Sequence, residues 1–359
     1  MQPSPLATPA AHPAAPLRVA QWSTGTIGSR ALRALVDHPE LVLAGVYSHT
    51  PAKQGRDAAE LCGSPAPTGV PATGDIGEIL RGTPDCVLYM PQTCDIDEVC
   101  RILDAGTNIV TTAGVFHHPG SMDPGVRARV EAACATGGTS IHSTGSSPGF
   151  ITEAVPLVLA SIQRHLDKLS IQEYADLSQR NSPAILFDVM GFGAPPGDFA
   201  QVRLDHLRNS FGPSLRLLAD GIGLPLDEVT ATGEVATAAR TFDIAAGTIP
   251  QGTVAAQRIT ISGIHKGRPV LRFQAIWHCG AQAETGWEIR PTGWHLSVEG
   301  DAPLEIDMVF PFPLDRMAEH SPAYTANRAV NAVRYVCAAA PGIRTVLDLP
   351  PITATLGRA

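Results

Sequence analysis

Two adjacent histidines follow a strand-like stretch in the segment NIVTTAGVFHHPG, residues 108–120. An imidazole titrates near neutral pH, so His117 or His118 could donate a proton to a developing alkoxide or accept one from an alcohol. The two residues could instead form a polar turn before Pro119 and Gly120, with one ring exposed and the other hydrogen-bonded. The sequence leaves both interpretations open.

A glycine-rich turn, WSTGTIGSR, follows a short apolar stretch at residues 17–22. It matches the pattern G-x-G-x-x-G at Gly25 and Gly28, while Ser23 stands in the place of the first glycine. Such glycines let the backbone approach a pyrophosphate, and the next helix offers its N-terminal N–H groups to the anion. The position between a strand and a helix favours dinucleotide binding over a purely structural tight turn.

The segment VYSHTPAKQGRD ends the second strand-like stretch and bears on the choice of coenzyme. NAD enzymes usually place a carboxylate here, about 20 residues past the glycines, on the ribose 2′-hydroxyl. This chain has Ser48 and His49, then Lys53 and Arg56, and no carboxylate before Asp57. Hydroxyl and cationic donors suit a 2′-phosphate, which favours NADP and leaves NAD possible. Lys53 and Arg56 could also be solvated loop charges.

Strand and helix patterns alternate through the first half of the chain, which predicts a doubly wound parallel sheet. Ligands of such sheets bind beyond the carboxyl ends of the strands, where the turns above lie. The predicted strands cover residues 17–22, 41–48, 85–90, 108–112 and 139–144, and the predicted helices residues 27–39, 95–106 and 123–138.

The regular alternation stops in the second half, where long β-rich stretches predict an α+β domain with an open mixed sheet. The segment SPGFITEA opens a predicted helix of about fifteen residues. The β-rich stretches are residues 168–178, a hairpin at 255–280 that turns at HKGR, 293–301 and 304–312, and the helices lie at about 198–221 and from Ser321 onward.

Composition bounds the domain count and the class of protein. A chain of 359 residues, 44% hydrophobic and 17% charged, predicts two globular domains. We expect a disordered Pro/Ala-rich tail at 1–16, a dinucleotide-binding domain at 17–147, a substrate and dimerisation domain at 148–320, and a C-terminal helix and tail at 321–359.

The charge, the hydropathy and the cysteines argue against a nucleic-acid surface, a membrane span, disulfides and a metal site. The net charge is −8 without a Lys/Arg cluster, which argues against a nucleic-acid surface. The sequence contains no run of about 18 apolar residues, so no membrane-spanning helix is predicted. Seven scattered cysteines without a C-x-x-C pair predict reduced thiols in the cytoplasm. His278 and Cys279 have no third ligand at a suitable spacing, so no metal site is expected.

Several stretches, taken together and in order, resemble the dihydrodipicolinate-reductase-like superfamily. The resemblance extends over residues 17–350 and is nearest to the branch of 2,4-diaminopentanoate dehydrogenase and the native amine dehydrogenases. The stretches that carry it are WSTGTIG, GRDAAEL, TGSSPGF, ADLSQRNSP, DVMGFG and NAVRYVCAAAPGI.

This resemblance implies a Rossmann domain, a substrate domain, a C-terminal helix that returns to the nucleotide domain, and a homodimer. It also implies NAD(P)-dependent oxidative deamination of an amine, or reductive amination of a ketone or aldehyde. By position, the implied coenzyme contacts are Thr24, Gly25, Thr26, Ile27 and Gly28 at the pyrophosphate, Ser48, His49 and Lys53 at the adenosine ribose, Pro91, Gln92, Thr112 and Ala113 toward the nicotinamide, and Asn331 at the side of the pocket.

The match breaks after the strand-like stretch NIVTT, where the amine dehydrogenases carry a glutamate that handles the proton of the amine. Here Ala113, Gly114 and Val115 follow, and none is a carboxylate. In the stretch TGSSPGF, Ser147 stands where asparagine is expected. An ammonium or iminium group needs a nearby anion, and addition of ammonia needs a base. Another carboxylate must take this role, or the substrate is not an amine.

Asp176 and Ser178 lie where the superfamily places active-site groups. Asp176 could be the substitute anion with Ser178 as a hydrogen-bond donor, or the pair could cap a turn at the end of a strand. Glu173 and Tyr174 alternate faces on a strand and cannot share one cleft. Glu153 is expected to be a first-turn helix charge.

Three functions therefore remain open. The first is an NADP-dependent amine dehydrogenase, and the second is an NADPH-dependent reductase of a carbonyl or C=C substrate with His117 or His118 as proton donor. The third is a nucleotide-binding sensor without turnover. The apolar stretch AILFDVMGFG predicts a hydrophobic pocket wall and hence a hydrophobic ketone or amine as substrate.

Overall fold

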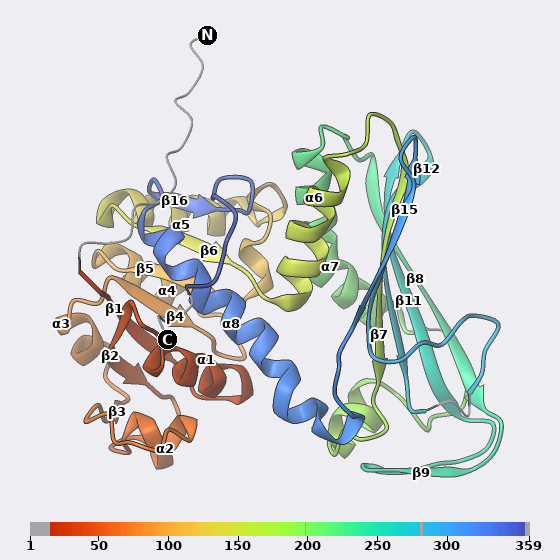
Figure 1. Cartoon of the computed structure of the whole chain (residues 1–359), viewed down its shortest axis with the longest axis horizontal. Coiled ribbons are helices and arrows are strands. Elements are labelled where there is room, and N and C mark those ends of the chain that lie inside the picture. The colour runs from red at the N-terminus through yellow and green to blue at the C-terminus, as the bar shows by residue number, and fades with distance from the viewer. Residues whose placement is uncertain (1–14, 198, 281–282, 356–359) are drawn as a thin grey trace. The chain divides into compact units, whose positions relative to one another are not determined.

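A computed structural model describes residues 15–197, 199–280 and 283–355. They form two compact units, residues 15–150 together with 321–355, and residues 151–320 (Figure 1). Of the tail expected at 1–16, residues 1–14 lie outside the described residues.

The first unit is built on a parallel sheet whose strands follow the order β16-β6-β5-β4-β1-β2-β3. The first strand lies in the middle, and the chain winds outward from it in both directions. This arrangement confirms the predicted doubly wound fold. The strands are β1 (Leu17–Trp22), β2 (Leu41–Tyr47), β3 (Ala72–Thr73), β4 (Cys86–Tyr89), β5 (Asn108–Thr111), β6 (Ser140–Ser143) and β16 (Gly342–Arg344).

Helices cover both faces of this sheet, because β1 points apolar side chains alternately to the two sides. Val19 packs with Ala31 of α1 (Thr26–Val36) and with α8 (Met317–Cys337). Ala20 and Trp22 face α4 (Ile96–Asp104) and α5 (Pro124–Gly137). The shorter helices α2 (Ala58–Cys62) and α3 (Ile76–Arg81) complete the unit.

The late helix begins at Met317 and not at Ser321, so the predicted start was wrong. Proline often marks a first helical turn, but Pro322 lies inside this helix and is buried. A short 3₁₀ helix, Leu314–Arg316, runs directly into α8 and extends it toward the N-terminus.

The second unit contains a mixed sheet in the order β13-β8-β11-β12-β7-β14-β15, in which β7 and β12 pair in parallel and the other pairs are antiparallel. The predicted hairpin is confirmed, with Lys266 and Gly267 between its strands. The strands are β7 (Leu166–Asp176), β8 (Glu228–Ala238), β11 (Val254–His265), β12 (Arg268–His278), β13 (Ala283–Glu284), β14 (Gly293–Gly300) and β15 (Leu304–Val309), besides the small hairpin of β9 (Phe242–Ile244) and β10 (Gly247–Ile249).

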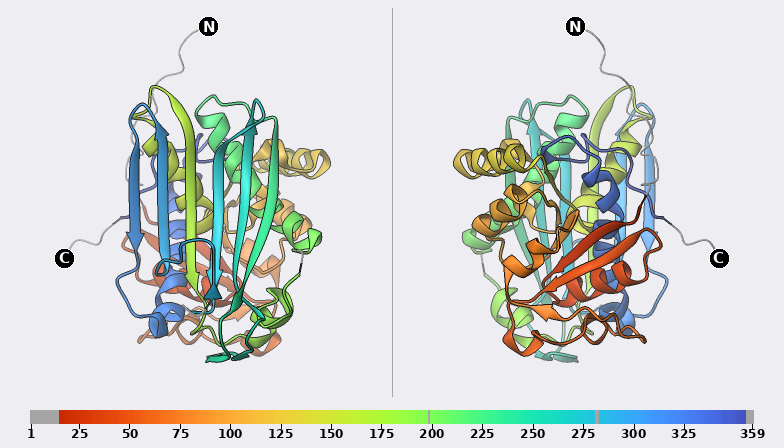
Figure 2. Two further views of the ribbon diagram at one scale, coloured as in Figure 1. Left: turned by 90° about the vertical axis from the view of Figure 1, so that its right-hand side faces the viewer. Right: turned by 90° about the vertical axis from the view of Figure 1, so that its left-hand side faces the viewer.

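One face of this sheet packs against helix α7 (Gln201–Gly221), as the stacked rings of Phe211 and Phe273 show. Phe273 pairs in register with Ile171, so the odd-numbered residues of β7 point to the α7 face and the even-numbered ones to the other. In the left view of Figure 2, no helix among the described residues covers that other face.

The helix expected after SPGFITEA is shorter than predicted. Only α6 (Val155–Ala160) is regular, and an irregular π-type segment, Ser146–Ala154, precedes it. Within that segment Gly149 has φ of 122°, a backbone conformation that regular helix excludes. Proline and glycine in SPGF therefore delay the helix.

Candidate functional site

The glycine turn between β1 and α1 has a distinct role for each of its key residues. Ser23, in the place of the first glycine, adopts the left-handed conformation with φ of 72°. Its carbonyl accepts a hydrogen bond from Gln21 Nε2 at 2.9 Å, and a Cβ on Gly28 would overlap that carbonyl. A Cβ on Gly25 would meet nothing within 4 Å. Packing therefore requires Gly28, the third glycine position of the motif, and Gly25, the second, leaves the backbone open to solvent.

The N-terminus of α1 is arranged for an anion. No described side chain caps it, and its first turn has no acidic residue. Nearby, Lys53 Nζ donates to the carbonyl oxygen of Thr24 at 2.8 Å, so this cation belongs to the turn. Thr24 is buried, and its Oγ1 has no hydrogen-bond partner among the described residues. Helix N–H groups, a cation and an unused hydroxyl fit the pyrophosphate of a dinucleotide.

At the end of β2, His49 bridges the glycine turn and α4. Its Nδ1 lies 3.4 Å from Ser23 Oγ, and its Nε2 lies 3.2 Å from Glu98 Oε1. The hydroxyl of Tyr89 donates to the other oxygen of Glu98 at 2.9 Å. The ring of Tyr47 meets the His49 ring edge-on, with centroids 4.9 Å apart. A carboxylate thus reaches the end of β2 from another element.

The remaining polar residues after β2 are engaged within the protein. Ser48 is buried, and its Oγ accepts the N–H of Thr50 at 3.3 Å. Arg56 pairs with Glu60 at 3.1 Å on the protein surface. Of the two cations considered for a 2′-phosphate, Lys53 alone contacts the glycine turn.

Residues expected near the nicotinamide follow β4 and β5. Pro91 and Gln92 come after β4, and Thr112 and Ala113 come after β5. Because all strands of this sheet are parallel, these residues lie at the same end of the sheet as the glycine turn, beyond the carboxyl ends of the strands. The carbonyl of Ala113 accepts a hydrogen bond from Ser143 Oγ at 2.7 Å, which fixes the end of β5 to that of β6.

The two histidines lie between two short 3₁₀ turns, Gly114–Phe116 and Pro119–Ser121, after the carboxyl end of β5. His117 is 2% exposed, whereas His118 is partly exposed. His118 Nδ1 lies 2.6 Å from Ser121 Oγ, so the hydroxyl orients the ring. The polar-turn alternative expected one exposed ring and one hydrogen-bonded ring. Here the partly exposed ring, His118, makes the contact with Ser121, and His117 is buried.

Asn331 does not lie at the carboxyl ends of the strands, where the coenzyme was expected, so its predicted place was wrong. It lines a small cavity with Leu17 and Leu41, which begin β1 and β2, and therefore lies at the amino ends of the strands. Helix α8 runs along the sheet from one end of the strands to the other. The sequence alone does not show beside which end each of its residues lies.

In the second unit, Asp176 ends β7 on the face opposite to α7. One carboxylate oxygen accepts the N–H of Ser178 at 2.9 Å, which is the turn-capping arrangement. The other lies 4.0 Å from Nδ1 of His278, the residue paired with it on β12. His278 is buried, and its Nε2 has no hydrogen-bond partner among the described residues.

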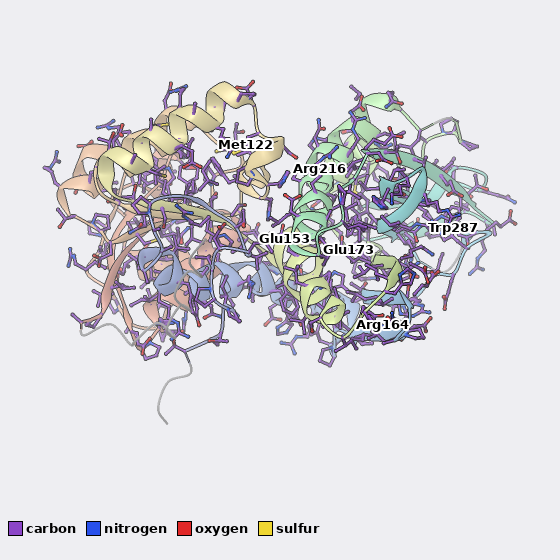
Figure 3. All side chains as sticks on the ribbon, turned by 90° about the horizontal axis from the view of Figure 1, so that it is seen from above. Met122, Glu153, Arg164, Glu173, Arg216 and Trp287 are labelled. Carbon is purple, nitrogen blue, oxygen red and sulfur yellow. The ribbon has the colours of Figure 1, made fainter. Side chains whose placement is uncertain are left out.

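The neighbouring acidic residues differ in their surroundings. Glu173 points to the α7 face of β7 and accepts a hydrogen bond from Trp294 Nε1 at 3.2 Å, while Tyr174 points to the opposite face. Glu153, expected as a first-turn helix charge, is 2% exposed and accepts a hydrogen bond from Ser214 Oγ at 2.6 Å. Glu153 and Glu173 are labelled in Figure 3.

Burial and a neighbouring charge act on the thiol beside this site. Burial, with a smaller contribution from the Asp176 carboxylate, raises the pKa of Cys279 to about 12. The thiol therefore stays protonated and is not a nucleophile at neutral pH.

The apolar stretch AILFDVMGFG mainly builds a core. Leu186 and Phe192 are fully enclosed and pack with Ala238, Ile249 and Val254. Val189 is exposed. This stretch is therefore only in part available as a pocket wall.

Among the described residues, no group of three or more His, Cys, Asp or Glu side chains could hold a metal ion. Within the same part of the chain, no helix is long and apolar enough to cross a membrane.

The sequence did not indicate that Glu98 lies near the glycine turn. Glu98 lies in the first turn of α4, where a carboxylate commonly stabilises the positive end of the helix dipole. Its contact with His49 joins residues 49 positions apart and depends on β1 lying between β2 and β4. No local pattern in the sequence carries that information.

Known dehydrogenases are similar to this chain in sequence. Residues 150–359 match the family model of the 2,4-diaminopentanoate dehydrogenase C-terminal domain. An amine dehydrogenase of Streptomyces virginiae is 28% identical over 357 residues, covering 94% of this chain and 98% of that protein.

Two solved structures share the fold. The amine dehydrogenase from Mycobacterium smegmatis has a TM-score of 0.74 at 19% identity, covering 96% of this chain and 99% of the other. The myo-inositol 2-dehydrogenase from Lactobacillus plantarum has a TM-score of 0.51 at 14% identity and covers 89% of each chain.

Proposed function

This chain belongs to the family of 2,4-diaminopentanoate dehydrogenase and is an oxidoreductase, and we propose that it is an NAD(P)-dependent amine dehydrogenase. The reaction would be reductive amination of a ketone or aldehyde with ammonia, or the reverse oxidative deamination. The relative from Streptomyces virginiae, matched over nearly its whole length, supports this choice.

The observation that carries the proposal is the open glycine turn at α1. No described residue lies within 4 Å of the place where a Cβ on Gly25 would stand, and the helix start, uncapped by any described side chain, lies beside the Lys53 cation. Together they suit the pyrophosphate of a nicotinamide dinucleotide. When bound, that coenzyme supplies the hydride chemistry. NADP is the proposed coenzyme because of Lys53 and His49, with NAD as the alternative.

The protein must also handle a proton and a cationic nitrogen. No carboxylate stands at residues 113–115 after β5, so we propose Asp176 as the anion, with Ser178 beside it. Glu173 is a second candidate, because Trp294 orients its carboxylate on the other face of β7. Either group would stabilise an ammonium or iminium charge and accept a proton.

A second candidate function is reduction of a carbonyl or C=C substrate. The lack of a carboxylate at residues 113–115 favours it, as does the oriented ring of His118 near the end of β5. His118, or the enclosed His117, would then donate the proton. A nucleotide-binding sensor without turnover is the third possibility.

We further assign the coenzyme to residues 17–147 and the substrate, a hydrophobic ketone or amine, to residues 148–320, in a homodimer. The free cysteines, among the described residues, support a location in the reducing cytoplasm.

The test is NADPH oxidation with a panel of hydrophobic ketones and aldehydes at mildly alkaline pH, with and without excess ammonium. Oxidation that needs ammonium is the expected result. Asp176→Asn and Glu173→Gln, compared side by side, then identify the carboxylate that supports turnover. Oxidation without ammonium overturns the amine proposal and makes His118→Ala and His117→Ala the next variants. Tight binding of NADPH without any turnover supports the sensor.

A further inference from the structure

A carboxylate from another element lies beside the end of β2, although no acidic residue directly follows that strand. Glu98 comes from the first turn of α4 and contacts His49 Nε2 at 3.2 Å. The Tyr89 hydroxyl holds its second oxygen at 2.9 Å, and Tyr89 itself is fully buried. The carboxylate is therefore fixed in place, although its side chain is still 20% exposed.

The negative charge of Glu98 affects the pKa of a neighbouring tyrosine. Burial raises the pKa of the Tyr47 hydroxyl, and the Glu98 carboxylate adds to this shift, while Arg101 opposes it. Tyr47 ends β2 and stacks on Trp22, with ring centroids 3.8 Å apart. The field of Glu98 thus reaches across the end of β2.

The position matters because in this fold the residues at the end of the second strand contact the adenosine ribose. A carboxylate there accepts a hydrogen bond from a ribose 2′-hydroxyl. The same carboxylate repels a 2′-phosphate, which carries nearly two negative charges at neutral pH. Lys53 and His49 attract that phosphate, so the residues at this place act in opposite directions.

We propose that Glu98 is a specificity-determining residue of the coenzyme site, which lowers the preference for NADP over NAD by placing a carboxylate beside His49. The inference rests on the proposed nicotinamide coenzyme. When a 2′-phosphate binds, it competes with Glu98 for the His49 ring and is repelled by the fixed Glu98 carboxylate. When NAD binds, its 2′-hydroxyl takes a place beside both groups without that cost.

The experiment measures the dissociation constants of NADPH and NADH for the full chain by titration calorimetry. Glu98→Gln keeps the size of the side chain and removes its charge. We expect its affinity for NADPH relative to NADH to rise roughly tenfold over the parent, and the gain to shrink at high salt. Adenosine 2′,5′-bisphosphate and 5′-AMP, measured in the same way, should show the same relative shift.

Asp97→Asn is the matched control. Asp97 precedes Glu98 in the same helical turn, and the change in net charge is the same, but its carboxylate pairs with Arg129. Its ratio of NADPH to NADH affinity should equal that of the parent. Glu98→Asp keeps the charge and should retain most of the parent's ratio.

The outcomes separate this inference from the proposed function. If both coenzymes bind and Glu98→Gln leaves their ratio unchanged, Glu98 has no role in specificity and the coenzyme assignment stands. An equal shift in Asp97→Asn also overturns the inference, since net charge alone would explain it. If the parent binds neither coenzyme, the proposed function fails together with the inference.

Discussion

Helix α1 differs from helices α2 to α5 of the first unit in what accepts the free N–H groups at its N-terminus. Helices α2, α3, α4 and α5 each begin after an aspartate whose carboxylate accepts a backbone N–H of the first turn. Helix α1 begins after Gly25, with no cap from any described side chain. The capping residues are Asp57, Asp75, Asp95 and Asp123.

The difference has a physical meaning. The first N–H groups of every helix lack partners within the helix, and an anion is the best partner for them. Four helices supply that anion from the chain itself. At α1 the chain supplies a cation instead, because Lys53 contacts the carbonyl of Thr24. This difference supports our proposal that the N-terminus of α1 receives its anion from a ligand.

The sharpest test compares two substitutions in the α1 turn. In Gly28→Ala the new methyl group overlaps the Ser23 carbonyl, so we expect a loss of about 3 kcal/mol of folding stability and at least a tenfold loss of coenzyme affinity. In Gly25→Ala nothing is displaced, and the backbone angles of −71° and −166° are open to alanine. Thermal unfolding and coenzyme titration measure the two effects.

Gly25→Ala should keep or slightly raise stability, by about 0.5 kcal/mol, because alanine restricts the unfolded chain. Its coenzyme affinity should nevertheless fall about tenfold, since the methyl group occupies the space that we assign to the pyrophosphate. Unchanged coenzyme affinity in this variant would break the comparison, because α1 would then be merely an uncapped helix.

The next effect concerns the cation at the turn. In Lys53→Met the side chain keeps most of its apolar stem and loses its charge. We expect the affinity for NADH to fall about tenfold and that for NADPH to fall further, because Lys53 also attracts the 2′-phosphate, with larger losses at low salt. Arg56→Met is the control, because Arg56 pairs with Glu60 at the surface and should change the affinity little. Equal losses in both variants would show that general surface charge is responsible.

Local patterns were sufficient to predict most of the fold. Strand β1 was predicted with its observed bounds, and the hairpin of β11 and β12 was found from its turn at Lys266 and Gly267. Strand β8 was missed, since its residues 228–238 alternate polar and small side chains without a strong apolar face. Periodicity reports the local backbone and is weak where a strand buries little surface.

The site was only partly predictable, because its groups come from different elements. The glycine turn lies within one short segment, so its spacing was visible in the sequence. Glu98 reaches His49 from another strand–helix unit, and Asn331 lies at the far edge of the sheet. These placements depend on strand order and on the rotation of a helix about its axis, and neither is encoded in local spacing.

A smaller effect is expected at a helix that supplies its own anion. The carboxylate of Asp123 accepts the N–H of Val126 at 2.9 Å at the start of α5. Asp123→Ala should lower folding stability by about 1 kcal/mol and leave coenzyme affinity unchanged. Thermal unfolding and calorimetry check both parts, and Asp123→Asn, which can still cap, should recover most of the loss. A loss of coenzyme affinity would mean that the caps and the α1 turn are not independent.

The smallest effect is the pH dependence of one of these caps. Hydrogen bonds from the backbone N–H groups of Thr68 and Ala59 lower the pKa of Asp57 from 3.8 to about 2. Because the folded chain holds the charged form more strongly than the unfolded chain, the stabilisation is complete above pH 3.8 and is lost as the pH falls toward 2. The difference in Tm between the parent and Asp57→Ala should therefore be constant near neutral pH and shrink through this acidic window. A difference that stays constant down to pH 2 would show that Asp57 acts by its shape and not by its charge, and the α1 turn would then differ from the capped helices in geometry alone.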